Sequence, residues 1–161
     1  MGGSQGGFPD QFLVRAWVDP VVESHGFPVN SAYTETMILP ILGPSATFAL
    51  RRLGAWAAAQ PEGLTVDIAE LASDLGLSHG GGRHSTMART IARLCKFEMA
   101  QWRGDGLPVR VAVAPVSERQ LVRLSARVVL AHRSMVRLRS SSPSPHPAVS
   151  ARLGSARSQP A

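Results

Sequence analysis

Apolar residues recur at helical spacing in three successive stretches of the chain, and this pattern predicts three helices. They are expected over residues 44–59, 67–75 and 85–97. Each stretch has one apolar side and one polar side, as in helices that pack on a core. The apolar positions are Phe48, Leu50, Leu53, Trp56, Ala57, Ile68, Leu71, Ala72, Leu75, Met87, Ile91 and Leu94.

The ends of the second and third helices carry capping signals. Asp67 is a typical N-cap residue, and Glu70 three positions later completes an arrangement that resembles a capping box. Gly76 ends the second helix, and Ser85 or Thr86 caps the third after a glycine-rich turn. The capping residues therefore predict the ends of these two helices, in addition to the spacing of their apolar residues.

Short β-type runs separate and follow these helices. Residues 64–66 form one run, and residues 99–103 and 107–114 form two more around the turn Gly104-Asp105-Gly106. In the last run, valines alternate with other residues, which is the period of a strand. An Asp-Gly turn between two such runs predicts a β-hairpin.

A last helix is predicted over 117–139, after the hairpin. Ser117 and Gln120 have the spacing of a capping box at its start. Its apolar side is expected to contain Leu121, Leu124, Val128 and Leu130.

Residues 11–43 have the least regular pattern of the chain. One short helical turn is predicted after Asp19-Pro20, and a further turn or two after Asn30 or Ser31, ending near Pro40. We expect this segment to be an N-terminal extension packed against the main core.

The order helix, strand, helix, helix, hairpin, helix predicts a mainly α fold with a small β-hairpin, an α+β domain over residues 44–139. Residues 1–10 are rich in glycine, and residues 140–161 are rich in serine, proline and alanine. Both segments lack the apolar pattern that a core requires. We expect both to be disordered, the second as a mildly basic tail.

The composition favours a single soluble domain. With 161 residues, 44% of them hydrophobic, the chain is long enough to form one core. No apolar run approaches the roughly 20 residues of a membrane span, and no signal peptide is recognised. The single cysteine, Cys95, excludes an internal disulfide and is typical of a reducing compartment. We therefore expect a cytoplasmic protein.

Charge is distributed unevenly along the chain. Residues 1–82 contain 3 basic and 8 acidic residues, a net charge of −5. Residues 83–161 contain 14 basic and 3 acidic residues, a net charge of +11. This asymmetry favours a polyanionic partner for the second half. A solvated basic surface without a partner is the alternative interpretation.

The order of elements resembles the winged helix-turn-helix family of DNA-binding proteins, in which a β-hairpin, the wing, follows the third helix. Residues 71–78 are similar to the first helix and turn of that motif: Ala72 matches the small residue between the helices, and Gly76 the glycine of the turn. The connection over residues 79–84 is longer than the turn of the simplest members. Residues 33–53, which include the sequence LPILGP, also loosely resemble small actinobacterial winged-helix proteins.

The resemblance implies that the third helix lies in the DNA major groove and that the wing contacts the minor groove or the backbone. The outward face of this helix contains Arg89, Arg93 and Lys96 at i, i+4 and i+7. Arginine can pair with the guanine edge, and serine and threonine commonly contact phosphate. The candidate DNA-binding residues are Arg83, His84, Ser85, Thr86, Arg89, Arg93, Lys96, Arg103 and Arg110.

Three features have alternative interpretations. The basic stripe on the third helix, formed by Arg89, Arg93 and Lys96, could be a solvated face without a partner. Trp102 in the hairpin is expected to pack on the core rather than stack on a sugar. Arg119, Arg123 and Arg127 on the last helix could contact the DNA backbone, face solvent, or accompany pairing of residues 117–139 with a second copy in a homodimer.

No catalytic or metal-binding pattern is recognised, so we expect neither an enzyme nor a bound cofactor. The glycines at 80–82 lack the following lysine of a phosphate-binding loop. Cys95 lies between core positions of the third helix, which favours an inert thiol. The spacings of His79, His84, Cys95 and His132 match no zinc pattern.

These observations predict a double-stranded DNA-binding protein that acts as a transcriptional regulator. The alternative is a winged-helix protein-interaction module in a larger nucleic-acid-processing complex, because this fold serves both uses. RNA binding is a weaker alternative, since clustered aromatic residues for base stacking are missing. The basic stripe discriminates between the first two, because a protein partner requires it only if that partner is acidic.

Overall fold

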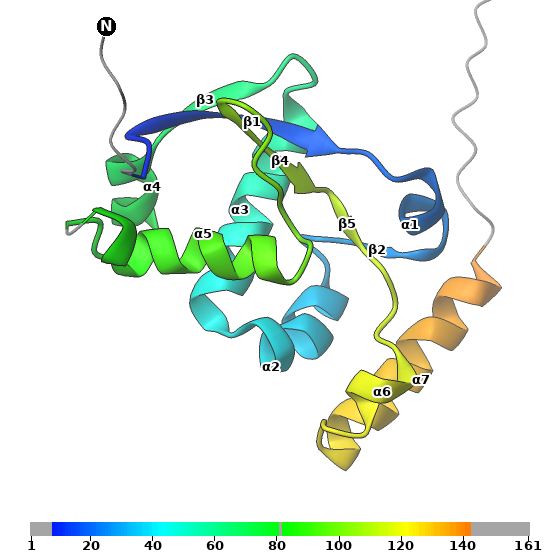
Figure 1. The fold of residues 1–161 in the computed structure, drawn as a ribbon. Coiled ribbons are helices and arrows are strands. Elements are labelled where there is room, and N and C mark those ends of the chain that lie inside the picture. Colours follow the sequence, from blue (N-terminus) through cyan, green and yellow to red (C-terminus); the bar gives the residue numbers. More distant parts are fainter. Residues whose placement is uncertain (1–7, 81, 143–161) are drawn as a thin grey trace, which may run out of the picture.

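The computed structural model describes residues 8–80 and 82–142, which form an α+β fold (Figure 1). Its strands are β1 (Gln11–Trp17), β2 (Phe27–Pro28), β3 (Leu64–Asp67), β4 (Gly106–Arg110) and β5 (Ala112–Val113). Its helices are α1 (Pro20–His25), α2 (Leu39–Leu42), α3 (Pro44–Ala59), α4 (Ile68–Asp74), α5 (Thr86–Lys96), α6 (Glu118–Leu121) and α7 (Ala126–Ser141). A π-helical turn spans Thr34–Ile38, and a 3-10 turn spans Gly82–His84. The predicted α+β class is confirmed.

The main sheet has three strands in the order β3-β1-β4. Strand β1 is antiparallel to β3, with Phe12 opposite Val66, and parallel to β4, with Val14 opposite Leu107. Strands β2 and β5 form a separate antiparallel pair. Residues 11–43 therefore do more than pack against the core as predicted, because they also supply the central strand of the sheet.

Helix α3 packs against β1 and β4 on one side and against α5 on the other. Buried side chains of all four elements belong to one hydrophobic core. Gly54 lies in α3 at a point where a Cβ atom would come within 2.9 Å of the carbonyl oxygen of Arg110 and within 2.5 Å of the Val29 side chain. Only glycine therefore allows α3 to lie this close to the end of β4.

The three helices predicted between residues 44 and 97 are present in the expected order, and the N-caps at Asp67 and Ser85 are confirmed. The Asp67 carboxylate accepts hydrogen bonds from the N–H groups of Ala69, at 2.8 Å, and Glu70, at 3.1 Å. At the start of α5, the Ser85 hydroxyl accepts a hydrogen bond from the N–H of Ala88 at 3.0 Å. These local interactions place α4 and α5 one after the other beside α3.

The predicted hairpin is present only in part. Residues 99–103 form two isolated bridges, at Ala100 and Arg103, instead of a strand, and the predicted strand 107–114 is divided into β4 and β5, of which β5 pairs with β2. Arg103 and Gly106 donate hydrogen bonds to each other's carbonyl oxygens, at 2.9 and 3.1 Å, and the N–H of Arg110 bonds the carbonyl of Met99 at 2.9 Å. Gly104 begins the turn with a φ of 60°. A positive φ at this position is typical of a tight hairpin turn and favours glycine.

The prediction of one continuous helix over 117–139 is wrong. The capping box at Ser117 is confirmed, but it opens only the short helix α6. Ser125 then caps α7, because its hydroxyl accepts a hydrogen bond from the N–H of Val128 at 3.4 Å. A second capping serine lets the chain change direction between two helical segments. Leu130, expected on the apolar side, is 63% exposed.

The first predicted turn near the N-terminus is confirmed, and the second is longer than expected. Asp19 caps α1 by accepting hydrogen bonds from two backbone N–H groups. The second helical segment does not stop near Pro40 but continues through α2 to Leu42. Pro40 occupies the first turn of α2, where a missing N–H costs little. Ser31 does not act as a cap, since its hydroxyl is buried without a hydrogen-bond partner in the described part of the chain.

The described segment extends beyond the predicted ordered region at both ends. The Phe8 ring packs edge-on against Trp102, with centroids 5.7 Å apart, and the Asp10 carbonyl accepts a hydrogen bond from Ile68 at 2.9 Å. Helix α7 continues to Ser141, past the predicted start of the tail at residue 140. The remaining residues predicted to be disordered, 1–7 and 143–161, lie outside the described residues. None of the described helices combines the length and the apolar character needed to cross a membrane.

Candidate nucleic-acid interface

Helix α5 has one buried face and one exposed face. The buried residues are Met87, Ala88, Thr90, Ile91 and Leu94. The opposite face is exposed and carries Arg89, Ala92, Arg93 and Lys96. The sequence therefore predicted the composition of both faces correctly, because the helical period alone decides which residues share a side.

Arg89 and Lys96 are the two cations of α5 that extend into solvent. Neither has an ion pair within residues 8–80 and 82–142. They are seven residues apart, which places their Cα atoms about 10 Å apart along the helix axis. The small side chain of Ala92 lies between them on the same face. This face therefore has a small side chain near its centre and a long cationic side chain at each end.

Arg93 lies on the same exposed face, but its guanidinium is engaged by neighbouring groups of the protein. Its Nη2 donates a hydrogen bond to the carbonyl of Ile41 at 3.1 Å, and its Nε bonds the carbonyl of Leu42. Its guanidinium also lies over the Phe97 ring, 5.0 Å from the centroid. These contacts tie the last turn of α2 to α5. These contacts give Arg93 a positioning role that local sequence could not reveal, because its partners are about 50 residues away. Its expected contact with DNA stays a prediction.

The residues before and at the start of α5 fall into two groups. Ser85 is only 6% exposed, and its hydroxyl caps the helix. This differs from the expectation that the hydroxyl is free to contact phosphate. Thr86 is half-buried, and its hydroxyl accepts a hydrogen bond from Ser78 at 3.0 Å. Arg83 and His84 are exposed on the 3-10 turn, where Arg83 Nε bonds His84 Nε2 at 3.1 Å. Of these four predicted residues, Arg83 and His84 are the accessible pair.

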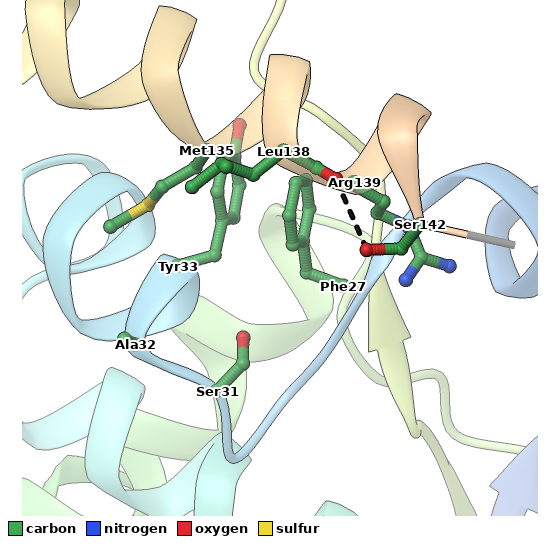
Figure 2. Close-up of a pocket in the computed structure, with 8 residues that line it drawn as sticks. All are labelled: Phe27, Ser31, Ala32, Tyr33, Met135, Leu138, Arg139 and Ser142. Atoms are coloured by element: carbon green, nitrogen blue, oxygen red, sulfur yellow. Dashed lines mark hydrogen bonds between the residues drawn. The ribbon is translucent and has the colours of Figure 1, made fainter.

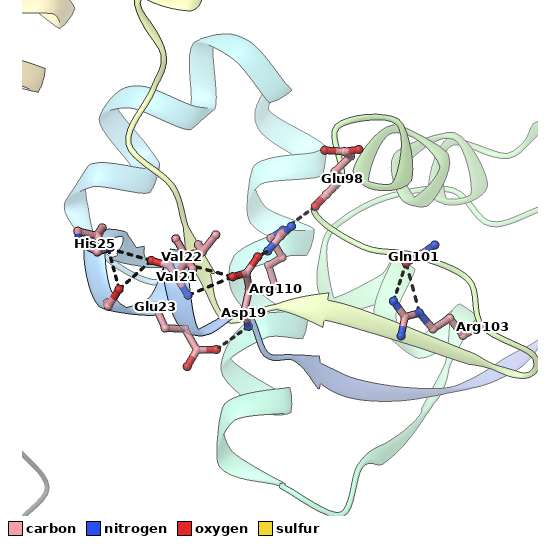
Figure 3. A network of polar contacts seen from close by, with 10 residues as sticks. Asp19, Val21, Val22, Glu23, His25, Glu98, Gln101, Arg103 and Arg110 are labelled. Carbon is pink, nitrogen blue, oxygen red and sulfur yellow. Dashed lines mark hydrogen bonds and ion pairs between the residues drawn. The ribbon is translucent and has the colours of Figure 1, made fainter.

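The two arginines of the hairpin also differ in accessibility. Arg110 Nη1 lies 3.2 Å from the Asp19 carboxylate, and its Nε donates a hydrogen bond to the Glu98 carbonyl at 2.8 Å (Figure 3). Its guanidinium lies 4.2 Å from the centroid of the Trp17 ring. Arg110 therefore has a structural role in the fold, and its expected contact with DNA stays a prediction. Arg103 is exposed, its Nη2 donates a hydrogen bond to the Gln101 side chain at 3.0 Å, and its guanidinium lies 5.8 Å from the centroid of the Trp17 ring.

The pairing of Arg110 with Asp19 has an electrostatic consequence. Backbone N–H donation from Val22 and the hydrogen bond from Arg110 hold the pKa of Asp19 below its ordinary value. The carboxylate therefore stays charged at neutral pH and holds the arginine against the end of β4. Asp19 and Arg110 are 91 residues apart in the chain, so no local pattern indicated their contact.

Two predictions about side chains beneath this surface are consistent with the structure. Trp102 packs edge-on against Phe8 and Phe12, with centroid distances of 5.7 and 5.5 Å, which confirms its position on the core. Cys95 is half-buried, and desolvation raises the pKa of its thiol, which disfavours the reactive thiolate.

A second candidate region is a hollow of about 320 Å³ between α7 and the N-terminal segment (Figure 2). The rings of Phe27 and Tyr33 stack inside it with centroids 3.8 Å apart. Met135 and Leu138 of α7 line the other side, and the Arg139 guanidinium lies 5.5 Å from the Phe27 centroid. The hollow is open and mostly apolar, and its cation is already engaged with a ring of the protein.

The described residues contain no group of three or more histidine, cysteine or acidic side chains arranged to hold a metal ion. Comparisons with protein-family models, with curated proteins and with solved structures find no match for this chain. The interpretation of the surface therefore depends on its own geometry and charge.

Proposed function

We propose that this protein binds double-stranded DNA through α5 and acts as a winged-helix transcriptional regulator. The observation that carries the proposal is the outward face of α5, where Arg89 and Lys96 extend into solvent without an acidic partner in the described residues. The order α3, β3, α4, α5 and hairpin supports it, since this is the order of a winged helix.

The accessible cations suggest a division of roles. A helix of this width fits the major groove of B-DNA, and Arg89, near the start of α5, is suited to reading a guanine edge. Lys96 at the other end and Arg83 before the helix are suited to phosphate contacts, which position the protein without specifying sequence. Arg103 on the hairpin is a candidate for the backbone beside this groove. Arg93 supports the surface by holding α5 against α2.

The test is fluorescence anisotropy with random duplex DNA, followed by selection of a preferred sequence from that pool. Arg89→Ala is expected to weaken binding to the selected sequence by about 1–3 kcal/mol more than binding to random duplex, because it removes a base contact. Lys96→Ala is expected to weaken both equally and to reduce the slope of log affinity against log salt by about 1.

A matched control is Arg133→Ala, which removes the same charge from an exposed position on α7. An equal loss in this variant would show that net charge rather than α5 determines binding. The absence of wild-type binding at about 50 mM salt would contradict the proposal outright.

The alternative, a protein-interaction module, is supported by a separate observation. The Phe48 ring is 54% exposed beside Leu75, in a hollow that Arg52 and Asp74 also line. An exposed aromatic ring bordered by charged groups is typical of a contact with another protein. If DNA binding is absent, this surface between α3 and α4 becomes the first place to test.

A further inference from the structure

The break between α6 and α7 brings a second set of cations to the end of α5. A cleft of about 300 Å³ is lined by Ile41 before the end of α2, by Phe97 directly after α5, and by Arg123 in the turn between α6 and α7. The same Phe97 ring lies beneath the Arg93 guanidinium, and Arg93 bonds the Ile41 carbonyl. Arg123 is therefore a close neighbour of the C-terminal end of α5, where Lys96 lies.

The segment that follows this point is strongly basic. Between residues 119 and 139 there are six arginines and no acidic residue, and Glu118 directly precedes them. The ion pairs in the described part of the chain involve Arg51, Arg52 and Arg110, and none of these six arginines. Arg123 is the cation that lines the Phe97 cleft, and Glu98 and Glu118 are the exposed acidic residues closest in the chain to this region.

The position of α7 is held by buried polar contacts rather than by apolar packing alone. Tyr33 Oη is 2.9 Å from His132 Nδ1 and accepts a hydrogen bond from the Val116 N–H at 2.8 Å. Farther along, Arg139 lies over the Phe27 ring. The arginines of the turn therefore extend from a fixed base, which lowers the conformational entropy lost when they bind a partner.

The outward side of α7 is poorly suited to pairing with a second copy of the chain. Arg133 and Arg137 are exposed on that side, and the apolar residues there are Leu130 and Leu138, which are eight residues apart and 63% and 68% exposed. In a symmetric pair these arginines would face like charges, which is destabilising. Pairing of α7 with its copy is therefore disfavoured. Of this basic segment, Arg123 lines the cleft beside Phe97, so the α6–α7 turn, rather than Arg133 and Arg137, is the part that a duplex held by α5 would meet.

We propose that Arg123, with Arg119 one turn before it, contacts the phosphate backbone of the same DNA duplex beyond the groove that α5 occupies. This inference rests on the proposed function and extends its footprint from α5 and the hairpin to the α6–α7 turn. Arg123 and Arg119 would contribute affinity and salt dependence, and no sequence preference, because phosphates are the same at every base pair.

The experiment compares the full chain with the variant Arg119→Gln/Arg123→Gln across a salt series from about 50 to 200 mM. The loss of two phosphate contacts is expected to reduce the log–log slope by about 2, and the ratio of affinities for selected and random duplexes is expected to stay unchanged. The control Arg133→Gln/Arg137→Gln removes the same charge from the part of α7 that runs toward α1, where Arg139 bonds the carbonyls of Glu23 and Ser24.

A second measurement uses duplexes shortened stepwise from either end. The wild type is expected to lose affinity at a greater duplex length than the Arg119→Gln/Arg123→Gln variant, because its contacts extend farther along the backbone. Equal slopes and equal length dependence in both proteins would overturn the inference while leaving the proposed function intact. A slope reduced as much in the Arg133→Gln/Arg137→Gln control would also overturn it. If the wild type does not bind DNA at low salt, the proposed function fails and the inference fails with it; an acidic protein then becomes the partner to test.

Discussion

Tyr33 is the only tyrosine of the chain, and it joins three segments by hydrogen bonds. Its oxygen accepts a hydrogen bond from the Val116 N–H and forms a second hydrogen bond with His132 Nδ1. Its ring stacks on Phe27. The sequence placed Tyr33 in a helical turn, but these partners lie up to 99 residues away and only the folded chain shows them.

The pH dependence of stability is expected to report on Tyr33. Burial raises the pKa of this phenol above its ordinary value of 10.0, because the charged form loses solvation. Its contribution to stability is therefore complete below pH 10 and is lost as the pH rises further. Tyr33→Phe should remove the part of the alkaline loss that is due to Tyr33, while the part due to Cys95 remains. The variant should be less stable at neutral pH by about 1–3 kcal/mol, since two buried groups lose a partner.

Urea unfolding at neutral and alkaline pH measures both effects. The ultraviolet absorbance of tyrosinate follows the titration directly, since no other tyrosine contributes. A variant as stable as the wild type at neutral pH, or a wild-type tyrosine that titrates at its ordinary pKa, would show that the buried network does not hold α7.

At the scale of elements, local signals predicted most helix starts and missed one. Asp67, Ser85 and Ser117 all act as the caps expected from their residue types. Ser125 has the same chemistry, yet it lies within a run of helical period, and the competing helix-forming pattern obscured it. A capping residue competes with the helix-forming tendency of its neighbours. At Ser125, the packing of α7 on Tyr33 decides that a new helix begins.

Arg93→Ala is expected to destabilise the fold by about 1–3 kcal/mol, because the carbonyls at the end of α2 lose a charged donor. Thermal or urea unfolding measures this loss. Arg89→Ala is the matched control on the same helix face, and its stability should stay within about 0.5 kcal/mol of the wild type.

Arg93 would instead belong to the binding surface if Arg93→Ala weakens DNA binding and leaves the free energy of unfolding unchanged. This distinction matters because the sequence grouped Arg93 with Arg89 and Lys96 on spacing alone. Helical period places a side chain on a face, but the neighbouring element decides where a long side chain ends.

At the scale of the whole molecule, β1 has a larger role than the sequence indicated, because it is the central strand of the main sheet. Its pattern is irregular because Phe12 and Val14 are buried while Leu13, on the opposite side, is half-buried. The strand lies between β3 and β4, which are about 40 residues apart in the chain. Strand order of this kind depends on pairing across the fold and leaves no local signal.

The amide protons of β1 are therefore expected to exchange with solvent only through global unfolding, as those of α3 do. A central strand has hydrogen-bonded neighbours on both sides and opens only when the sheet opens. Native-state hydrogen exchange in low urea measures this. Exchange of residues 11–17 at a free energy well below that of α3 would show that this segment behaves as a separable extension.

The sequence by itself determined the helices from residue 44 to 96, the hairpin turn at Gly104 and the two faces of α5, because helical period, caps and turn chemistry act over a few residues. The tertiary structure alone decided that β1 completes the sheet, that Arg93 and Arg110 bond distant groups of the protein, and that Arg123 lines a cleft with Phe97. These outcomes depend on contacts between residues far apart in the chain. Their energies exist only once the core has brought those residues together.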